Sequence, residues 1–396
     1  MKGNNTQLIK QANKFLLLNT IRFSGPITVE EIVSKTSLSR PTVLNILKEL
    51  QEENIVEKSG FAGYTGGRIP SLFVLSANSY YAIGVDFEFP PLRFVLSDLN
   101  GDIVDTLQSV LPYDSTKETI IDALISGISK LIEKSAIPRE KIMGIGLGIS
   151  GIVNVNSGFS IIIERIKDWK NVNIRKIIEE NFKLPVYIHN DVHLMGIAEK
   201  QLFLNKTDTF IYIGIRSGIG AAVFMKGELY PGICGNAGFL GHMTIEVNGP
   251  LCCCGSKGCL EMFSSETAIT KSYYEARTGE FDREFTLQDI IRKAREGDDI
   301  ADNVLKKAGR SLGIGIANMI KLYEIPVVII GGCSDIENSS LMNSIVKAIS
   351  EDIYEYLLKD IKIVGSQLSR ELYPLGGCFV VIDRFFSEPK LKLFSS

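Results

Sequence analysis

The chain has 396 residues, of which 45% are hydrophobic and 22% are charged, and its 43 basic residues nearly balance its 46 acidic residues. This length favours two or three domains with sizeable cores, and the composition argues against a disordered chain. Because the net charge is only -3, any contact with nucleic acid must be local. The first residues hold no apolar signal core and no apolar run approaches membrane-spanning length, so we expect a cytoplasmic protein with no membrane partner.

The first 76 residues have the pattern of a helix-turn-helix domain. Residues 7–23 predict a helix that stops at a Ser-Gly-Pro sequence. A second helix begins after Thr28, where Glu31 completes a capping box. Ser39 is the expected N-cap of a third helix, with Pro41 in its first turn. Two short helices joined by a tight turn are the parts of a DNA-binding unit.

A wing follows the three predicted helices. Residues 55–58 and 72–75 predict two strands, joined by a glycine-rich tip that carries Arg68. An ordinary helical cap with solvated charges is the alternative, but the wing and its cationic tip favour DNA binding. We expect phosphate contacts from Lys48 and Lys58 and base contacts from the start of the third helix. The predicted DNA-binding residues are Ser39, Arg40, Thr42, Asn45, Lys48 and Arg68.

From Tyr80 onward, strands alternate with helices. Residues 81–87, residues 92–101 with a turn at their end, and a strand starting at 102 predict a meander. A helix over Lys117–Ser135 then leads to an apolar strand that ends in a glycine loop at Ser150 and Gly151. A second unit ends in Asn190-Asp191. Later strands finish at the small-residue turns 217–220 and 331–332. The pattern predicts a mixed α/β fold, in which ligands collect at the carboxyl ends of strands.

Four of the seven cysteines lie within eight residues, at positions 252, 253, 254 and 259. The spacing C-x-C-x4-C, with His242 upstream, supplies three thiolates and one imidazole, which is a tetrahedral zinc set. Glycines at 255 and 258 allow a tight backbone there. Packing of small buried hydrophobes is the alternative. We predict a structural zinc ion on His242, Cys252, Cys254 and Cys259, with Cys253 outside the ligand set.

Together these features resemble the ROK family of sugar-responsive repressors and sugar kinases. The resemblance rests on the winged helix, the Asn190-Asp191 pair, the Gly238-x-x-Gly241-His242 segment and the cysteine box that closes on Gly-Cys-Leu-Glu. It implies two lobes of the actin and hexokinase type behind the winged helix-turn-helix, with a sugar cleft between the lobes. The sugar-binding residues that it implies are Ser150, Gly151, Asn190, Asp191, Phe239, His242 and Glu261.

Two departures from the family pattern bear on activity. Family kinases follow the first strand's aspartate with a glycine-rich phosphate loop, whereas here Asp86 precedes Phe-Glu-Phe-Pro-Pro. Phe239 stands where the family usually has a glutamate that accepts sugar hydroxyls. The Phe239 departure leaves the identity of the sugar open. From the lost phosphate loop we expect no catalysis and no ATP cofactor. The alternative is a sugar kinase that transfers the γ-phosphate of ATP, with Asp191 as its base.

The expected function is a transcriptional regulator, most simply a repressor of carbohydrate-utilisation genes. Its expected partners are operator DNA, a small sugar effector and further copies of itself in a homodimer or homotetramer. We expect a winged helix-turn-helix domain over 1–76, a first lobe over 77–190 that is rejoined by a C-terminal helix over 380–396, and a second lobe over 191–379.

Overall fold

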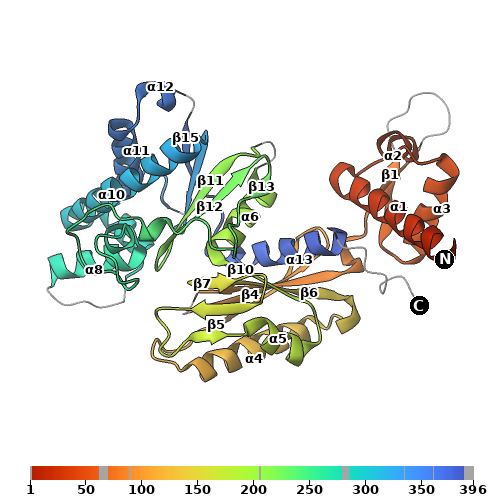
Figure 1. Ribbon diagram of the computed structural model, residues 1–396, viewed down its shortest axis with the longest axis horizontal. Coiled ribbons are helices and arrows are strands. Elements are labelled where there is room, and N and C mark those ends of the chain that lie inside the picture. The colour runs from red at the N-terminus through yellow and green to blue at the C-terminus, as the bar shows by residue number, and fades with distance from the viewer. Residues whose placement is uncertain are drawn as a thin grey trace.

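The computed structural model describes most of the chain. The described residues are 2–61, 70–88, 91–204, 207–278, 285–333, 335–359 and 361–387. Arg68 and positions 388–396 of the expected C-terminal helix lie outside them. Figure 1 shows an N-terminal helical domain to one side of two α/β lobes. Within the described part of the chain, no helix combines the length and the apolarity that crossing a membrane needs.

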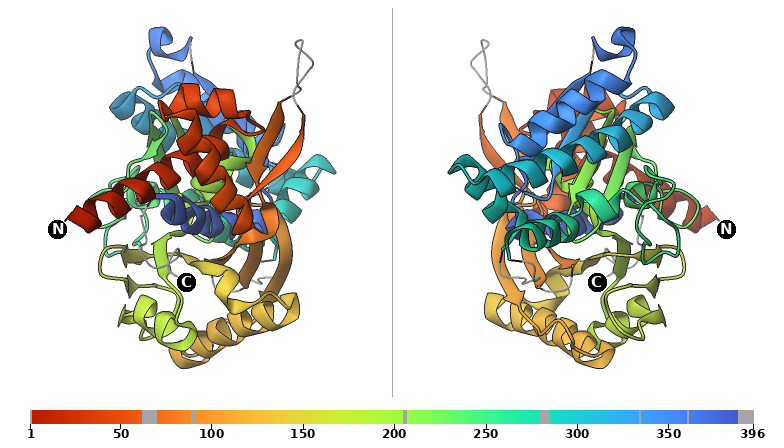
Figure 2. Two further views of the ribbon diagram at one scale, coloured as in Figure 1. Left: turned by 90° about the vertical axis from the view of Figure 1, so that its right-hand side faces the viewer. Right: turned by 90° about the vertical axis from the view of Figure 1, so that its left-hand side faces the viewer.

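The N-terminal domain consists of three helices and a two-stranded wing. These are α1 (Lys2–Ser24), α2 (Val29–Thr36), α3 (Arg40–Glu52), β1 (Val56–Phe61) and β2 (Ser71–Leu75). The expected capping box is present, since the Thr28 hydroxyl accepts from the Glu31 N–H at 3.3 Å and the Glu31 carboxylate accepts from the Thr28 N–H at 2.8 Å. Figure 2 (left) shows β1 and β2 beside the helices, with the lobes behind them.

The first lobe is built on a five-stranded sheet in the order β10-β6-β3-β4-β5. Its strands are β3 (Tyr81–Phe87), β4 (Leu92–Asp98), β5 (Ile103–Ser109), β6 (Ile142–Ile149) and β10 (Val186–Asn190). Because β3, β6 and β10 are parallel, their carboxyl ends meet at one edge of the sheet. The residues that follow these strands, among them Glu88, Ser150 and Asp191, are therefore gathered at that edge.

Two helices and a small sheet complete the first lobe. Helix α4 (Lys117–Ser135) has the predicted bounds and packs on β4 and β5, and α5 (Ile174–Phe182) packs on β10. A three-stranded antiparallel sheet, which the sequence pattern did not predict, follows β6. Its strands are β7 (Ile152–Asn154), β8 (Phe159–Ile162) and β9 (Lys170–Val172). They are too short to leave a recognisable alternation of polar and apolar residues.

The second lobe has its own five-stranded sheet, in the order β13-β12-β11-β14-β15, and its own hydrophobic core. The strands are β11 (Phe210–Ile215), β12 (Ile219–Met225), β13 (Glu228–Leu229), β14 (Val327–Gly331) and β15 (Lys362–Gly365). The helices are α7 (Glu261–Ser264), α8 (Glu266–Arg277), α9 (Leu287–Arg295), α10 (Asp299–Tyr323), α11 (Ser340–Asp352) and α12 (Glu355–Leu358).

Helices α6 (Asp191–Phe203) and α13 (Leu375–Ser387) pack against each other between the two lobes (Figure 1). Helix α13 begins at Leu375 rather than at 380. Adjacent glycines disfavour a helix by propensity, but here they permit close packing. A Cβ on Gly376 would lie 2.0 Å from the Leu194 carbonyl oxygen, and a Cβ on Gly377 would lie 2.5 Å from that of Gly146. Tertiary contact therefore outweighs propensity. The expected domain limits at 190/191 and 379/380 stay a proposal.

The C-terminal end of α13 contacts the N-terminal domain. The Asn19 side-chain amide donates to the Phe386 carbonyl at 3.1 Å, and Arg22 pairs with Asp383 at 2.5 Å. Buried residues of α1 and α13 belong to one continuous hydrophobic cluster. The winged-helix domain thus packs on α13, the same helix that lies between the two lobes.

Candidate ligand cleft, zinc segment and DNA-binding face

Helix α3 presents a polar side to solvent. Its apolar stripe, Val43, Ile46, Leu47 and Leu50, is buried. Of the predicted DNA-binding residues, Ser39, Arg40, Asn45 and Lys48 are exposed and Thr42 is half-buried. Ser39 caps the helix by accepting from the Thr42 N–H at 3.3 Å, and Arg40 pairs with Glu30 of α2.

Leu44 also lies on the solvent side of α3, with 45% of its surface exposed. Leu44 was not among the predicted DNA-binding residues, because a leucine near an apolar stripe is ordinarily assigned to the core. An exposed apolar side chain on a helix of this kind suits contact with a thymine methyl group.

All seven residues of the predicted sugar site line one cavity of about 500 Å³ between the lobes. Ser150, Gly151, Asn190 and Asp191 come from the carboxyl edge of the first sheet. Phe239, His242 and Glu261 come from the second lobe. The volume is in the range of cavities that bind small molecules.

The wall from the second lobe has a specific backbone. Gly238 has a φ of +94°, and a Cβ there would lie 1.9 Å from the Ala221 carbonyl oxygen, so this position requires glycine. The Glu261 carboxylate accepts from the Ile219 N–H at 3.3 Å. The Phe239 ring meets His242 edge-on, with centroids 5.9 Å apart, and is 37% exposed. An aromatic face and a fixed carboxylate therefore border the same cavity.

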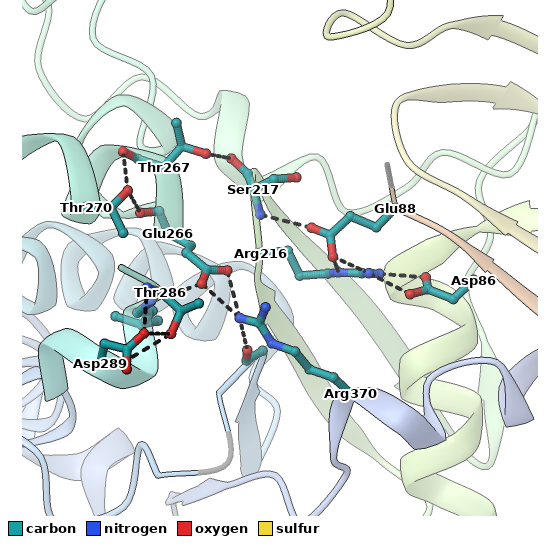
Figure 3. Close-up of polar contacts among 12 residues, drawn as sticks. Asp86, Glu88, Arg216, Ser217, Glu266, Thr267, Thr270, Thr286, Asp289 and Arg370 are labelled. Carbon is teal, nitrogen blue, oxygen red and sulfur yellow. Dashed lines mark hydrogen bonds and ion pairs between the residues drawn. The ribbon is translucent and has the colours of Figure 1, made fainter. Parts of the chain in front are cut away.

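Arg216, which sequence reasoning missed, lies at the floor of this cavity and is 4% exposed. It follows β11 of the second lobe, and it contacts the buried carboxylates of Asp86 and Glu88 in the first lobe (Figure 3). It also contacts Asp191 at the start of α6. Its guanidinium donates to Asp86 Oδ1 at 2.9 Å and Oδ2 at 2.7 Å, to Glu88 Oε2 at 2.8 Å and to Asp191 Oδ2 at 3.1 Å. Arg93 adds a second cation, 3.3 Å from Asp86.

This cluster shifts the pKa values of two carboxyls in opposite directions. Burial alone would raise the pKa of Glu88, but Arg216 and the donated Ser217 N–H outweigh it and lower the pKa to about 2. Burial raises the pKa of Asp191 to about 6, because its contact with Arg216 is single and both Asp86 and Glu88 repel it. Of these two carboxyls, Asp191 is thus the one that takes up a proton at the higher pH.

A second cavity of about 620 Å³ lies on the other side of the cluster. It is lined by Glu88, Arg93, Glu266 and Arg370, among others. Arg370 is held there by both carboxylate oxygens of Glu266, at 2.9 and 2.8 Å (Figure 3).

The two cavities share the lining residues Arg165, Ser217 and Thr267. Arg165 Nη2 donates to the Thr267 hydroxyl at 3.2 Å, and that hydroxyl donates to the Ser217 carbonyl oxygen at 3.0 Å. Arg216 lines the first cavity, Glu88 lines the second, and Arg216 Nε donates to Glu88 Oε2 at 2.8 Å, so this pair lies between the two cavities. We refer to these five residues as the partition.

The cysteine segment gathers the four predicted zinc ligands. The donor atoms of His242, Cys252, Cys254 and Cys259 all lie within 4.8 Å of one another. His242 Nδ1 is 3.6 Å from Cys252 Sγ, and Cys254 Sγ is 3.6 Å from Cys259 Sγ. Since a tetrahedral zinc site with Zn–S of about 2.3 Å has edges of about 3.8 Å, the donor set fits zinc.

One backbone position of the cysteine segment requires glycine. Gly258 has a φ of +68°, and a Cβ there would lie 1.5 Å from the Glu246 carbonyl oxygen. Cys253 lines the ligand cavity, and its Sγ is 3.9 Å from Glu261 Oε1. The four-donor set therefore leaves Cys253 on the side of the cleft.

Comparison with known proteins identifies the family. A model described as the ROK family matches residues 82–382. The chain belongs to the ROK family. A MarR family model matches residues 11–60 of the N-terminal domain. The ROK match and the winged helix confirm the predicted combination of a DNA-binding head and two α/β lobes.

Relatives match over nearly the whole chain. The xylose repressor of Caldicellulosiruptor bescii is 30% identical and covers 98% of this chain, and 99% of its own length is matched. The transcriptional dual regulator NagC of Escherichia coli K12 is 26% identical, with 96% of this chain and 94% of its own length matched. A crystal structure of a ROK family transcriptional regulator, a homolog of the E. coli MLC protein, shares the fold. Its TM-score is 0.80 at 24% identity, over 96% of this chain and 97% of that one.

Proposed function

We propose that this ROK protein is a sugar-responsive repressor of carbohydrate-utilisation genes whose cleft binds a sugar without phosphorylating it. The observation that carries the proposal is the partition, with Arg216 at its centre. It stands beside a sugar cavity in a chain that also bears a winged helix. Full-length similarity to a xylose repressor supports the same assignment.

In this proposal Asn190, Asp191 and Glu261 bind sugar hydroxyls in the cavity, and Phe239 stacks on a CH-rich face of the sugar ring. The backbone at Ser150 and Gly151 closes the cavity on the side of the first lobe. These residues come from both lobes, so a bound sugar contacts the two lobes at once. A ligand of this kind favours the lobe arrangement in which both sets of contacts are made.

The partition argues against the kinase alternative with Asp191 as base. Phosphoryl transfer requires the attacking hydroxyl and the phosphorus to approach within about 3–3.5 Å. Here Arg216, Glu88 and Ser217 stand between the sugar cavity and the second cavity. Asp86, which would face the phosphates, is held by both terminal nitrogens of Arg216. A negatively charged triphosphate would also meet Glu88 at this point.

In the zinc segment, His242, Cys252, Cys254 and Cys259 would hold a structural Zn²⁺ ion. The ion would supply no chemistry to a reaction. It would fix the loop that carries His242 and the start of α7, where Glu261 enters the sugar cavity.

The polar side of α3 would contact base edges in the major groove of operator DNA. Two winged helices of a homodimer or homotetramer would bind paired half-sites. Helices α6 and α13 provide the physical connection to the cleft, since α6 begins at Asp191 and α13 ends on α1. A change in lobe closure would therefore alter the position of the winged helix.

Isothermal titration against a panel of sugars tests the binding part of the proposal, with xylose and N-acetylglucosamine included. We expect one of the sugars to bind the wild-type chain, and Asp191→Asn to weaken that binding by tenfold or more, because the charged acceptor is lost. A coupled assay of ATP turnover with the same sugars should stay at background. Robust sugar-dependent turnover that Asp191→Asn abolishes would establish the kinase instead.

A further inference from the structure

Arg216 is bound from all sides within the described part of the chain. It is 4% exposed, and its partners Asp86, Glu88 and Asp191 are 3%, 9% and 6% exposed. The guanidinium carbon also lies 5.0 Å from the centre of the Tyr373 ring. A buried arginine with this many partners is held in one orientation, and water does not replace those partners.

Two of the three partners, Asp86 and Glu88, come from the first lobe, and the arginine comes from the second. Asp86 is the next-to-last residue of β3, Glu88 follows that strand, and Asp191 begins α6 after β10 of the same sheet. Arg216 lies in the turn between β11 and β12 of the second lobe. The contacts of Arg216 with Asp86 and Glu88 therefore cross the cleft and join the lobes (Figure 3).

The carboxylates around Arg216 are the kind of set that binds a hard cation. Both oxygens of Asp86 and one each of Glu88 and Asp191 face the guanidinium. Oxygen ligands of this type suit Mg²⁺ or Ca²⁺. Without a cation, three buried carboxylates would repel one another, because burial weakens the screening by water. Arg216 supplies the positive charge from within the chain.

The same residue is linked to the sugar cavity in two ways. Its Nη1 holds Asp191, which lines the cavity. The turn that follows Arg216 reaches Glu261 on the opposite wall, through the Ile219 N–H. Ligand contacts at Asp191 and at Glu261 thus both depend on where the Arg216 turn lies.

We propose that Arg216 is an inter-lobe positioning residue: its guanidinium takes the place of a divalent cation among Asp86, Glu88 and Asp191, joins the lobes, and orients Asp191 toward the ligand. The ligand part of this inference rests on the proposed function. The inter-lobe part does not, because it concerns the cluster alone.

Replacement of Arg216 tests the inter-lobe part. Arg216→Ala leaves the three carboxylates uncompensated, so we expect a larger radius of gyration by small-angle X-ray scattering and a lower melting temperature. Millimolar Ca²⁺ or Mg²⁺ should reverse both changes in a saturable manner, because the cation enters the vacated place. Wild type should be indifferent to these ions, and adding Asp86→Asn to Arg216→Ala should weaken the rescue at least tenfold. Arg310→Gln, which alters an arginine that is 71% exposed, is the control and should behave as wild type.

Sugar titration tests the ligand part. We expect Arg216→Ala to bind the sugar identified for wild type at least tenfold more weakly, and Arg216→Lys, whose single ammonium reaches fewer carboxylates, to fall between the two. If Arg216→Ala does not fold even when the cation is added, the sugar affinity of Arg216→Lys decides the ligand part.

Three results would overturn the proposal: wild-type behaviour of Arg216→Ala in scattering, wild-type sugar affinity of the alanine or lysine variant, or indifference of the alanine variant to both ions. If wild type binds no sugar, the proposed function fails, and the scattering and cation measurements still decide the inter-lobe role.

Discussion

At the scale of single residues, the zinc segment offers two adjacent cysteines with different expected roles. Cys254 belongs to the four-donor set, whereas Cys253 lines the ligand cavity, and both are exposed. Removal of one thiolate ligand leaves an incomplete zinc site, and metal binding and folding are coupled.

We predict that Cys254→Ser lowers the zinc content well below one ion per chain and lowers the melting temperature, as chelation of wild type should also do. Elemental analysis and thermal denaturation check this. Cys253→Ser is the matched control and should retain one zinc. Equal zinc loss in both variants, or no zinc in wild type, would contradict the assignment.

The Asp191 carboxyl predicts a pH dependence of ligand binding. Its pKa is raised to about 6 by burial and by Asp86 and Glu88, against the opposing effect of Arg216. Because the folded pKa lies above the ordinary value, the folded state takes up a proton in the window between these two values. This carboxyl therefore contributes less stability as the pH rises through that window.

For the sugar the charged form is the better acceptor. We predict that affinity is constant above about pH 7 and falls by up to about tenfold per pH unit below about pH 6. Isothermal titration from pH 5 to 8 measures this, with Asp191→Asn expected to be weak and flat. An affinity of wild type that is unchanged over the whole range would show that protonation of Asp191 does not govern binding.

At the scale of elements, α3 is positioned by its own sequence. Ser39 caps it, its apolar stripe is buried, and Asn45 faces solvent. A side-chain amide on the exposed side of such a helix can pair with adenine in two hydrogen bonds.

We predict that Asn45→Ala weakens binding to the operator by about 1–3 kcal/mol without changing the melting temperature. Gln51→Ala, in the last turn of the same helix, should have little effect, because the start of the helix makes the base contacts. Fluorescence anisotropy at fixed salt measures both. A loss that is equal for the two variants would place the base contacts elsewhere.

The elements also show which features local sequence specifies. The caps at Thr28 and Ser39 and helix α4 were predicted closely, because capping residues and amphipathic periodicity act within a few positions. The start of α13 was not, because its glycine pair is helical only in contact with α6 and β6. The cavity residues were named from a family resemblance, and their meeting depends on strand order.

Arg216 illustrates the same limit at the cleft. In the sequence it is a lone arginine between an apolar strand and a glycine turn, which ordinarily indicates a solvated charge. Its partners lie 25, 128 and 130 residues away along the chain, so only the assembled lobes reveal the cluster. Local patterns cannot report an interaction of this range.

At the scale of the whole molecule, the sugar cavity, the Arg216 cluster and the winged helix are connected through packed helices. Helix α6 begins at the cavity with Asp191, and α13 packs on α6 and ends against α1. By linkage, a sugar that prefers one lobe arrangement must change DNA affinity if the winged helices of an oligomer are spaced differently in that arrangement.

The most direct test of this account is a titration of the DNA upstream of the chain's own gene with the purified protein, at fixed salt, with and without a saturating concentration of the sugar that binds. We predict that the sugar changes the operator Kd by about 5–150-fold for wild type, and that Asp191→Asn largely removes this change. An operator affinity that is the same with and without saturating sugar would contradict the account.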